Sequence, residues 1–245
     1  MKNITSKLEW ILKGLLALVL LAPILVSEKY FFPYITPKVV FFRWLVFASL
    51  ILFSFIFYQK KEIIYKTTKI WWAFLSLSGA YFVSAIFGTF FEKSFWSNIE
   101  RADGVVLMWY LFVYFALLVF AFRKKVEWKW LWRFALGICF YICGYGVLQH
   151  LGYIDILSST GVRIASTFGN PAYLGNYALM NTFLALYMIV GDKNRKWLLF
   201  YIPSFLVSGW SVFLTQTRGS ILGLVGGLGI AFLLAIFFSK YKKIK

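Results

Sequence analysis

Long apolar runs separated by short polar connections make up most of this chain. Eight runs have about 18–22 residues each, which is the length that a helix needs to cross the hydrocarbon core of a membrane. Strands of a membrane barrel would instead alternate apolar and polar positions over about ten residues, so helices are predicted throughout. The eight predicted helices cover residues 9–27, 38–58, 70–91, 104–122, 130–149, 172–190, 197–215 and 219–238.

Lysine is concentrated in every second connection. The N-terminus, residues 59–69, 123–129 and 191–196, and the C-terminal tail, together with Arg133 near the start of the fifth predicted helix, hold 19 of the 26 basic residues. The positive-inside rule places such segments in the cytoplasm. The alternation holds across all eight predicted helices, so both termini are predicted to be cytoplasmic. The fold class predicted is therefore an all-α polytopic membrane protein, with residues 1–245 forming a single transmembrane helical domain.

Composition agrees with this pattern. Hydrophobic residues make up 61% of the chain and charged residues only 14%, whereas soluble domains carry roughly a quarter charged residues. A formal net charge of +17 would suggest nucleic acid in a soluble protein. Here the charges lie between apolar runs, as is typical of membrane proteins. The lipid bilayer is the predicted surrounding, and nucleic acid is not a predicted partner.

The N-terminus resembles a signal peptide, because Lys2, Lys7 and Lys13 precede an apolar run that ends at Val26. A signal peptide would end in a cleavage site of the Ala-x-Ala kind. Only Ala22-Pro23 stands near that position, so the run is interpreted as a first transmembrane helix.

Arginine is enriched on the side predicted to face outward. Four of the seven basic residues there are arginine, against three of nineteen inside. An arginine near membrane depth is costly without a partner. Arg163 and Arg218 have no acidic neighbour in sequence, whereas Arg101 lies between Glu100 and Asp103. The seven outer basic residues are Lys29, Lys38, Arg43, Lys93, Arg101, Arg163 and Arg218.

Residues 161–181 contain many hydrogen-bonding side chains on both sides of a Gly-Asn-Pro sequence. Pro171 suits the first turn of a helix and Asn170 is a good N-cap. A helix N-terminus at the outer face offers free N–H groups to an anion, and the planar fork of Arg163 matches phosphate oxygens. Two interpretations stay open: Asn170 caps the helix and also serves a pyrophosphate site, or it only caps. Asn176 and Asn181 can likewise simply bond neighbouring helices.

A second polar stretch covers residues 94–104, where Trp96 can anchor at the interface. Arg101 is a candidate phosphate ligand, and Glu100 or Asp103 can accept from a sugar hydroxyl. The alternative is an interfacial ion pair that fixes the loop. His150, at the outer end of the fifth predicted helix, is a weak candidate for a general base, since a lone histidine at a helix end is more often an interface residue.

No Cys/His cluster with metal-ligand spacing exists, so neither a metal nor another cofactor is predicted. Cys139 and Cys143 lie one helical turn apart and are interpreted as small packing residues. The last predicted helix has a small residue at every fourth position, which predicts a ridge for close helix packing. This small-residue ridge consists of Gly219, Gly223, Gly227, Ala231 and Ala235.

Four segments resemble the O-antigen ligase and O-antigen polymerase superfamily, which includes bacterial O-oligosaccharyltransferases. These segments read "FFPYITPKVVFFRWL", "SFWSNIERADG", "RIASTFGNPAYLGNY" and "LTQTRGSILGL". They occur in order on a matching topology, and the resemblance runs from about residue 23 to the end. The Phe-Gly-Asn-Pro segment and the Thr-Gln-Thr-Arg-Gly turn are its most specific parts.

The resemblance implies a metal-independent, inverting glycosyltransferase in the bacterial inner membrane. Such an enzyme transfers a glycan from undecaprenyl pyrophosphate, on the periplasmic side, to lipid A core during lipopolysaccharide synthesis, to a growing glycan or to a protein hydroxyl. Outer arginines bind the pyrophosphate in the family, and Arg163 and Arg218 fall in matching motifs. Arg101 and Asn170 are the further donor-site candidates.

The chain departs from the family in length. Members have about twelve helices and a large periplasmic loop that carries the histidine thought to act on the acceptor. Residues 1–245 are therefore expected to be the N-terminal part of a longer protein, with much of the donor site and without the acceptor machinery. His150 does not lie in such a loop, and the histidine's role is not transferred to it.

Three other functions remain open. A flippase or exporter of lipid-linked polysaccharide should show internal repeats or ionisable groups near the membrane midplane, and neither is evident in the sequence. A non-catalytic scaffold would not need unpaired outer arginines. An inactive donor-binding fragment is the third alternative. The polar groups gather at the predicted outer face, which favours transfer chemistry there over transport.

Overall fold

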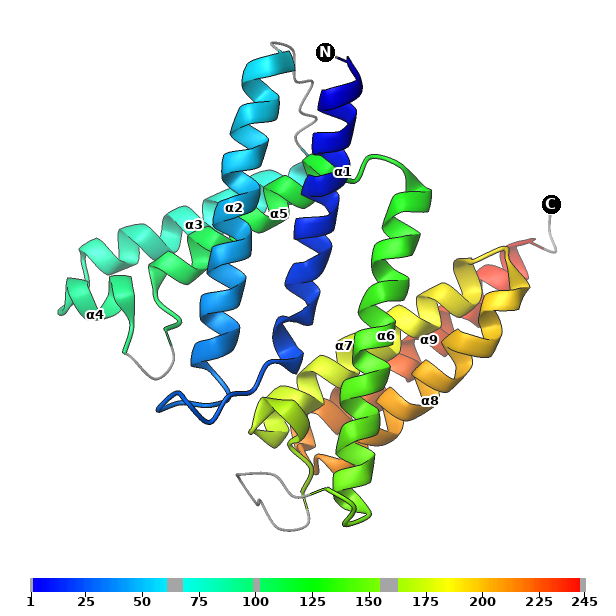
Figure 1. Cartoon of the computed structure of the whole chain (residues 1–245). Helices are drawn as coiled ribbons and strands as arrows, with labels where there is room; N and C mark the ends of the chain where they lie inside the picture. Colours follow the sequence, from blue (N-terminus) through cyan, green and yellow to red (C-terminus); the bar gives the residue numbers. More distant parts are fainter. Residues whose placement is uncertain (1, 61–67, 99–101, 155–162, 243–245) are drawn as a thin grey trace. The chain divides into compact units, whose positions relative to one another are not determined.

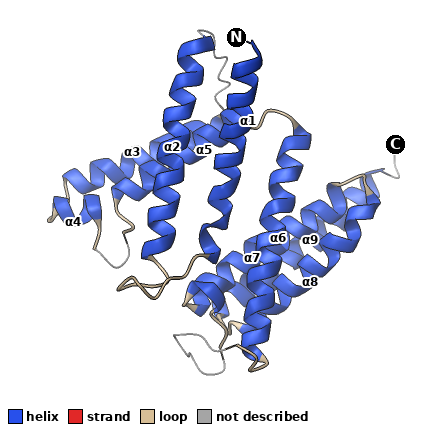
Figure 2. Cartoon of the chain, in the orientation of Figure 1, coloured by secondary structure: helices blue, strands red, loops and turns tan. Residues whose placement is uncertain are grey.

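Helices account for all regular secondary structure in the part of the chain that the structure describes (Figure 2). The computed structural model describes residues 2–60, 68–98, 102–154 and 163–242. The chain divides into two compact units, residues 1–134 and residues 135–245. Helix α6, Lys125–His150, begins in the first unit and continues into the second (Figure 1).

The first unit is built on three helices that pack together, α1, α2 and α5. Helix α3 packs against α5, and the short helix α4 contacts both. The elements of this unit are α1 (Lys2–Leu18), the 3-10 helix η1 (Val19–Ile24), α2 (Thr36–Lys60), α3 (Lys69–Ile86), α4 (Phe91–Trp96) and α5 (Val105–Ala121).

Side chains from α1, α2 and α5 form the core of the first unit. Leu12, Leu16 and Ile56 are completely buried there, beside Leu117 and Phe120. Lipid tails are as apolar as leucine, so van der Waals packing and buried hydrogen bonds hold such helices together rather than hydrophobic burial. One partly buried bond joins α5 to α1, where the Tyr114 hydroxyl donates to the Leu16 carbonyl at 3.0 Å.

The second unit packs α7 against both α8 and α9. A row of hydroxyl side chains follows one face of α8 and is buried. The Thr182 hydroxyl of α7 donates to Ser208 at 2.9 Å, so one polar bond crosses the α7–α8 contact. The elements of this unit are the rest of α6, η2 (Ser166–Phe168), α7 (Pro171–Gly191), η3 (Arg195–Trp197), α8 (Leu198–Leu214) and α9 (Arg218–Lys242). The buried hydroxyl row is Ser204, Ser208, Ser211 and Thr215.

Two members of the small-residue ridge explain how α9 approaches α7. A Cβ atom on Gly227 would lie 2.3 Å from the ring of Phe183, and one on Gly223 would lie 3.0 Å from Leu179. The predicted packing ridge is therefore confirmed at these two positions. A Cβ on Gly219 would meet nothing within 4 Å, so that glycine is not part of the seam.

Six helices in the described chain are long and apolar enough to cross a membrane: α2, α3, α6, α7, α9 and the α8 region from Arg195 to Leu214. Helix α5 is apolar but has 17 residues, and α1 also has 17. The polytopic all-helical class is thus supported, while the count of eight spans and the cytoplasmic placement of the termini stay predictions.

Two predicted helix boundaries were wrong. The first helix was expected over 9–27, but its α-helical part ends at Leu18. Pro23 has no N–H to donate to the carbonyl four residues earlier, and the chain finishes in a 3-10 turn with Leu25 bonded to Ala22 at 3.1 Å. The third predicted run, 70–91, breaks after Ile86, and α4 starts separately at Phe91.

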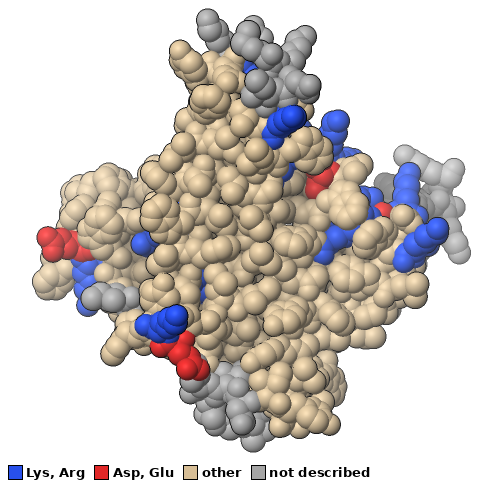
Figure 3. All heavy atoms as spheres, viewed as in Figure 1, with Lys and Arg blue, Asp and Glu red and all other residues tan. Residues whose placement is uncertain are grey.

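Much of the surface is neither basic nor acidic, as Figure 3 shows for one face. Large apolar side chains are exposed along the predicted spans, including Leu199 at 87% and Val190 at 78%. Such exposure is unfavourable in water over a continuous patch and is expected where side chains face lipid. The surface therefore agrees with a multi-pass membrane protein.

Candidate functional site

Arg163 joins two polar segments of the second unit that lie about fifty residues apart in sequence. Its Nε donates to the Thr215 carbonyl at 2.9 Å, and its Nη2 donates to the Thr217 hydroxyl at 3.3 Å. The backbone N–H of Ile164 also donates to the Leu214 carbonyl at 3.3 Å. We call these contacts, together with the first residues of α7 and α9, the Arg163 junction.

The turn between α8 and α9 presents Arg218. Helix α8 ends at Leu214, and Gln216 adopts a left-handed conformation with φ 49° that reverses the chain. Helix α9 then begins at Arg218 itself, whose side chain is exposed. Within the described part of the chain it makes no hydrogen bond or ion pair. The turn therefore places a free guanidinium at the N-terminus of a 25-residue helix.

The segment that carries Arg163 is fixed to the end of α6. The side-chain oxygen of Gln149 accepts from the N–H groups of Ala165 and Ser166, each at 3.1 Å. Ser166 is completely buried, has a φ of 47° and donates its hydroxyl to the Ile142 carbonyl at 2.7 Å. Backbone strain of this kind persists only where the surroundings enforce it, and here three hydrogen bonds do so.

Asn170 is the N-cap of α7, as predicted. Its side-chain oxygen accepts from the Ala172 N–H at 2.8 Å, and Pro171 occupies the first helical position. The Asn170 side chain is exposed. Its role as a phosphate ligand stays a prediction.

Replacing Asn170 with alanine is expected to reduce the free energy of unfolding by about 1 kcal/mol, because a cap oxygen is lost from one N–H of α7. The change would appear as a lower midpoint of thermal unfolding in a neutral detergent. Asn170→Ser, which restores a cap oxygen, should recover most of the loss. If Asn170→Ser unfolds at the same temperature as Asn170→Ala, the side chain matters for a reason other than capping.

The first turn of α9 lies beside the second turn of α7. Ser220 donates its hydroxyl to the Asn176 side-chain oxygen at 2.8 Å. A Cβ atom on Gly175 would lie 2.9 Å from the hydroxyls of both Ser220 and Thr215, so a larger residue there would displace these side chains. The N–H groups in the first turn of α9 have no acceptor within their own helix, whereas in α7 Pro171 has no N–H and Ala172 donates to Asn170. Two helix N-termini and Arg218 thus gather at one end of the second unit.

The other asparagine of α7 has a local role. Asn181 donates its amide to the Tyr177 carbonyl of the same helix at 2.9 Å. It lies two turns further along α7 than the junction and is buried. Of the three asparagines in the 161–181 stretch, Asn170 and Asn176 belong to the junction and Asn181 does not.

No protein-family model, curated protein or solved structure matches this chain. The resemblance to O-antigen ligases therefore remains a prediction from the four motifs. What the Arg163 junction does has to be argued from its own geometry.

Asp103 lies in the first unit and lines a hollow of about 390 Å3. Ser97 donates its hydroxyl to the Asp103 carboxylate. The hollow is lined by further hydroxyl groups from α3 and α4, namely those of Tyr81, Ser84 and Ser94. A carboxylate among hydroxyls is the kind of surface that binds sugar hydroxyls, so the predicted role of Asp103 fits its position. Glu100 and Arg101 lie outside the described residues.

Arg43 was predicted only as one of the outer arginines, and the structure gives it partners. Its Nη2 donates to the Ala102 carbonyl at 3.1 Å, and its guanidinium lies 5.9 Å from the centre of the Tyr110 ring. The contact joins α2 to the residue before Asp103. Sequence reasoning missed it because the two residues are 59 positions apart.

His150 is the last residue of α6 and is exposed. Its neighbour Gln149 contacts the Arg163 segment, but His150 makes no hydrogen bond or ion pair to any other described residue. The role of a general base therefore stays a weak prediction for His150. Gln149 itself was missed, and its only signal in the sequence was a polar side chain at the end of an apolar run.

No group of three His, Cys, Asp or Glu side chains comes together in the described part of the chain. Cys139 and Cys143 are buried free thiols with their sulfur atoms 3.6 Å apart. They pack with Ala178, Val212 and Leu224 in the core of the second unit. The interpretation of both cysteines as packing residues is confirmed.

Proposed function

We propose that the Arg163 junction binds the pyrophosphate of a polyprenyl-linked glycan, such as undecaprenyl pyrophosphate glycan. The proposal is supported chiefly by one observation: Arg163 holds the turn that presents Arg218 beside the N-termini of α7 and α9. Free N–H groups at the N-terminus of α9 and the charge of arginine favour the same ligand, an anion with several oxygens. The predicted outer placement would set this anion at lipid headgroup depth.

The reaction proposed is transfer of the glycan to an acceptor hydroxyl, as in O-antigen ligases. The acceptor oxygen attacks the anomeric carbon of the donor sugar, and the bond from that carbon to the pyrophosphate oxygen breaks. The hydroxyl proton passes to a base, and polyprenyl pyrophosphate leaves with an added negative charge. Arg218 and the helix N-termini would stabilise that developing charge. This chemistry needs neither a metal nor a nucleotide sugar.

The two arginines have different parts in this proposal. Arg163 donates hydrogen bonds to Thr215 and Thr217 and so positions the turn between α8 and α9. Arg218, which is exposed, is the group available to touch the phosphate. For the first unit by itself, Asp103 keeps its predicted role as a partner of sugar hydroxyls, at the hydroxyl-lined hollow. A bacterial inner-membrane location and an acceptor of lipid, glycan or protein belong to the same proposal.

Arg218→Ala is expected to weaken binding of undecaprenyl pyrophosphate glycan about tenfold, since one charge-assisted hydrogen bond is lost. The full chain in lipid nanodiscs would be titrated with the donor, and transfer to an added acceptor would be measured in parallel. Arg218→Lys should recover little of the lost binding if the fork geometry of arginine matters. The unfolding midpoint should not change, because the Arg218 side chain bonds to no described residue.

Arg195→Ala is the matched control. Arg195 is also exposed, lies in the same unit and begins the helical segment η3. Its substitution removes the same charge and should leave donor binding unchanged. Equal binding by the Arg218→Ala and Arg195→Ala proteins would contradict the donor site. In a separate assay, the protein would be placed in lipid vesicles. Movement of the donor across the vesicle membrane without glycan transfer would indicate an exporter instead.

A further inference from the structure

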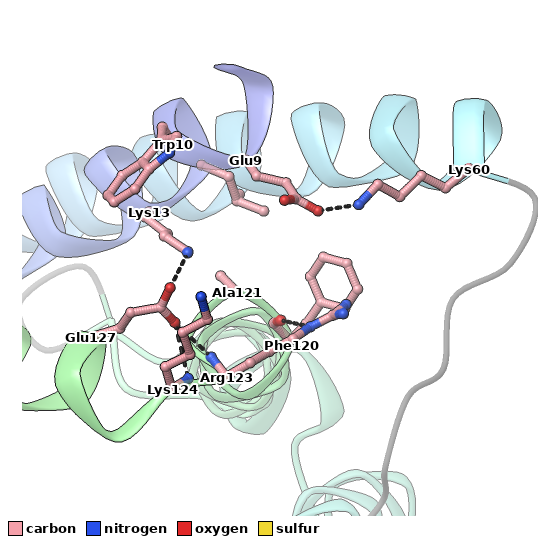
Figure 4. A pocket seen from close by; sticks show the side chains of 10 residues that line it. Glu9, Trp10, Lys13, Lys60, Phe120, Ala121, Arg123, Lys124 and Glu127 are labelled. Carbon is pink, nitrogen blue, oxygen red and sulfur yellow. Dashed lines mark hydrogen bonds and ion pairs between the residues drawn. The ribbon is translucent and has the colours of Figure 1, made fainter. Parts of the chain in front are cut away.

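A second polar cavity lies in the first unit, where the middle of α1, the end of α2, the end of α5 and the start of α6 meet (Figure 4). Its volume is about 280 Å3. The N-terminus, residues 59–69 and residues 123–129 are three of the segments predicted to face the cytoplasm. The structure thus joins helix ends that the charge pattern assigns to one side of the membrane.

Two ion pairs form the walls of this cavity. Lys13 donates to the Glu127 carboxylate at 2.7 Å, and Lys60 pairs with Glu9. Each links α1 to another segment of the unit. The two acidic side chains of the cavity are therefore both occupied by lysine.

Two further cations, Arg123 and Lys124, line the cavity and have no acidic partner in the described chain. The Arg123 Nε donates to the Phe120 carbonyl at 3.1 Å, and its guanidinium lies 4.9 Å from the centre of the Phe120 ring. These contacts fix the base of the guanidinium beside the cavity, as Figure 4 shows. Four cations and two carboxylates leave the cavity with an excess of two positive charges.

The backbone N–H groups of Arg123 and Lys124, just before α6, are already occupied. The Glu127 carboxylate accepts from them at 2.9 and 3.1 Å. These two residues can therefore bind a ligand only through their side chains. Positive side chains without an acidic partner favour a phosphate group, because its oxygens accept several charge-assisted hydrogen bonds at once.

The cavity also has an apolar side that a soluble phosphate would not use. Trp10 lines it and is 67% exposed, and the next residue, Ile11, is 53% exposed. Tryptophan is enriched at the depth of lipid headgroups. Trp128, near the start of α6, donates its indole N–H to the Phe122 carbonyl at 2.7 Å. A charged recess beside exposed apolar groups at headgroup depth fits a lipid better than a free anion.

We infer that this cavity binds the headgroup phosphate of an anionic glycerophospholipid through Arg123 and Lys124, with the lipid tails along α1 at Trp10 and Ile11. Basic pockets between helices at the cytoplasmic surface have the charge that anionic headgroups require. The inference is independent of the donor site in the second unit. A lipid bound here would bridge α1, α2 and the α5–α6 connection.

Lys124→Gln tests the inference with Lys125→Gln as its matched control. The two lysines are adjacent and exposed, and only Lys124 lines the cavity. The purified full chain in neutral detergent would be titrated with short-chain phosphatidylglycerol, and the rise of its unfolding midpoint would be followed. We expect Lys124→Gln to bind about fivefold more weakly than the unaltered protein, and Lys125→Gln to bind as the unaltered protein does. Without lipid, all three proteins should unfold at the same temperature.

Two further titrations separate the sources of phosphate. Phosphatidylcholine, whose headgroup has no net charge, and inorganic phosphate at the same concentration are both expected to leave the midpoint unchanged. A rise with phosphatidylcholine equal to that with phosphatidylglycerol would overturn recognition of anionic charge. A rise with inorganic phosphate that Lys124→Gln abolishes would overturn the lipid and indicate a soluble anion. Equal phosphatidylglycerol binding by Lys124→Gln and Lys125→Gln would overturn the site.

Discussion

Arg163→Ala is expected to lower the stability of the second unit and to abolish donor binding together. The substitution removes both bonds to the α8–α9 turn and leaves the Thr215 carbonyl, in a residue with no exposed surface, without its charged donor. Hydrogen bonds to charged groups contribute about 1.5–3 kcal/mol each. A loss of about 3 kcal/mol in the free energy of unfolding follows, measurable as a lower midpoint of thermal unfolding in detergent.

Two comparisons separate the structural part of Arg163 from any ligand part. Arg163→Lys keeps the charge but cannot reach the Thr215 carbonyl and Thr217 hydroxyl with one planar fork, so it should recover less than half of the lost stability. Arg218→Ala should weaken donor binding without changing the midpoint. If Arg163→Ala unfolded at the temperature of the unaltered protein, the turn would not depend on this side chain, and Arg163 would have to act on the ligand directly.

Gly104→Ala is expected to destabilise the first unit by about 3 kcal/mol, at the upper end for an overpacked site. A Cβ atom there would lie 2.5 Å from the Phe95 carbonyl oxygen and 2.8 Å from the Ser97 nitrogen. Both are backbone atoms, so no side-chain rotation can relieve the contact. The segment after α4 must move, and the Ser97 hydroxyl would leave the Asp103 carboxylate. The hollow beside Asp103 should change shape as a result.

Gly79→Ala provides the opposite control. Gly79 lies in the middle of α3, and a Cβ atom there would meet nothing within 4 Å. Alanine in a helix is favoured over glycine by about 1 kcal/mol, so this variant should be slightly more stable than the unaltered protein. Both substitutions add one methyl group to the same unit. Similar midpoints for Gly104→Ala and Gly79→Ala would show that the backbone around Phe95 is free to adjust.

Hydropathy predicted the helices well because membrane lipid leaves the backbone few other choices. The long runs from 38 to 58 and from 172 to 190 reappear as α2 and α7 with ends shifted by a few residues. The wrong helix boundaries arise at proline and glycine, whose effect on the backbone is not part of a hydropathy value. Pro23 ends the α-helical ladder of α1 although its neighbours are apolar, and the chain breaks near Gly88 inside the expected run 70–91.

The site was predictable in its parts and not in its contacts. Asn170 and Pro171 carry a local capping signal, because the cap bond joins residues two apart. The bond between Arg163 and Thr215 joins residues 52 apart, and no pattern within either segment specifies it. The same holds for Gln149, whose partners Ala165 and Ser166 lie 16 and 17 residues further along the chain. The sequence therefore predicted candidate residues, and only the tertiary structure shows which of them are in contact.

The two ion pairs of the cavity beside Arg123 and Lys124 can form at different stages of synthesis of the first unit. Glu9 and Lys60 are 51 residues apart, whereas Lys13 and Glu127 are 114 apart. Synthesis proceeds from the N-terminus, so α1 can be tied to α2 as soon as α2 is complete. The ion pair between Lys13 and Glu127 can form only later, after α3, α5 and the start of α6 have been made. The contacts of α1 within the first unit are therefore complete only after the start of α6, which carries Glu127, has been made.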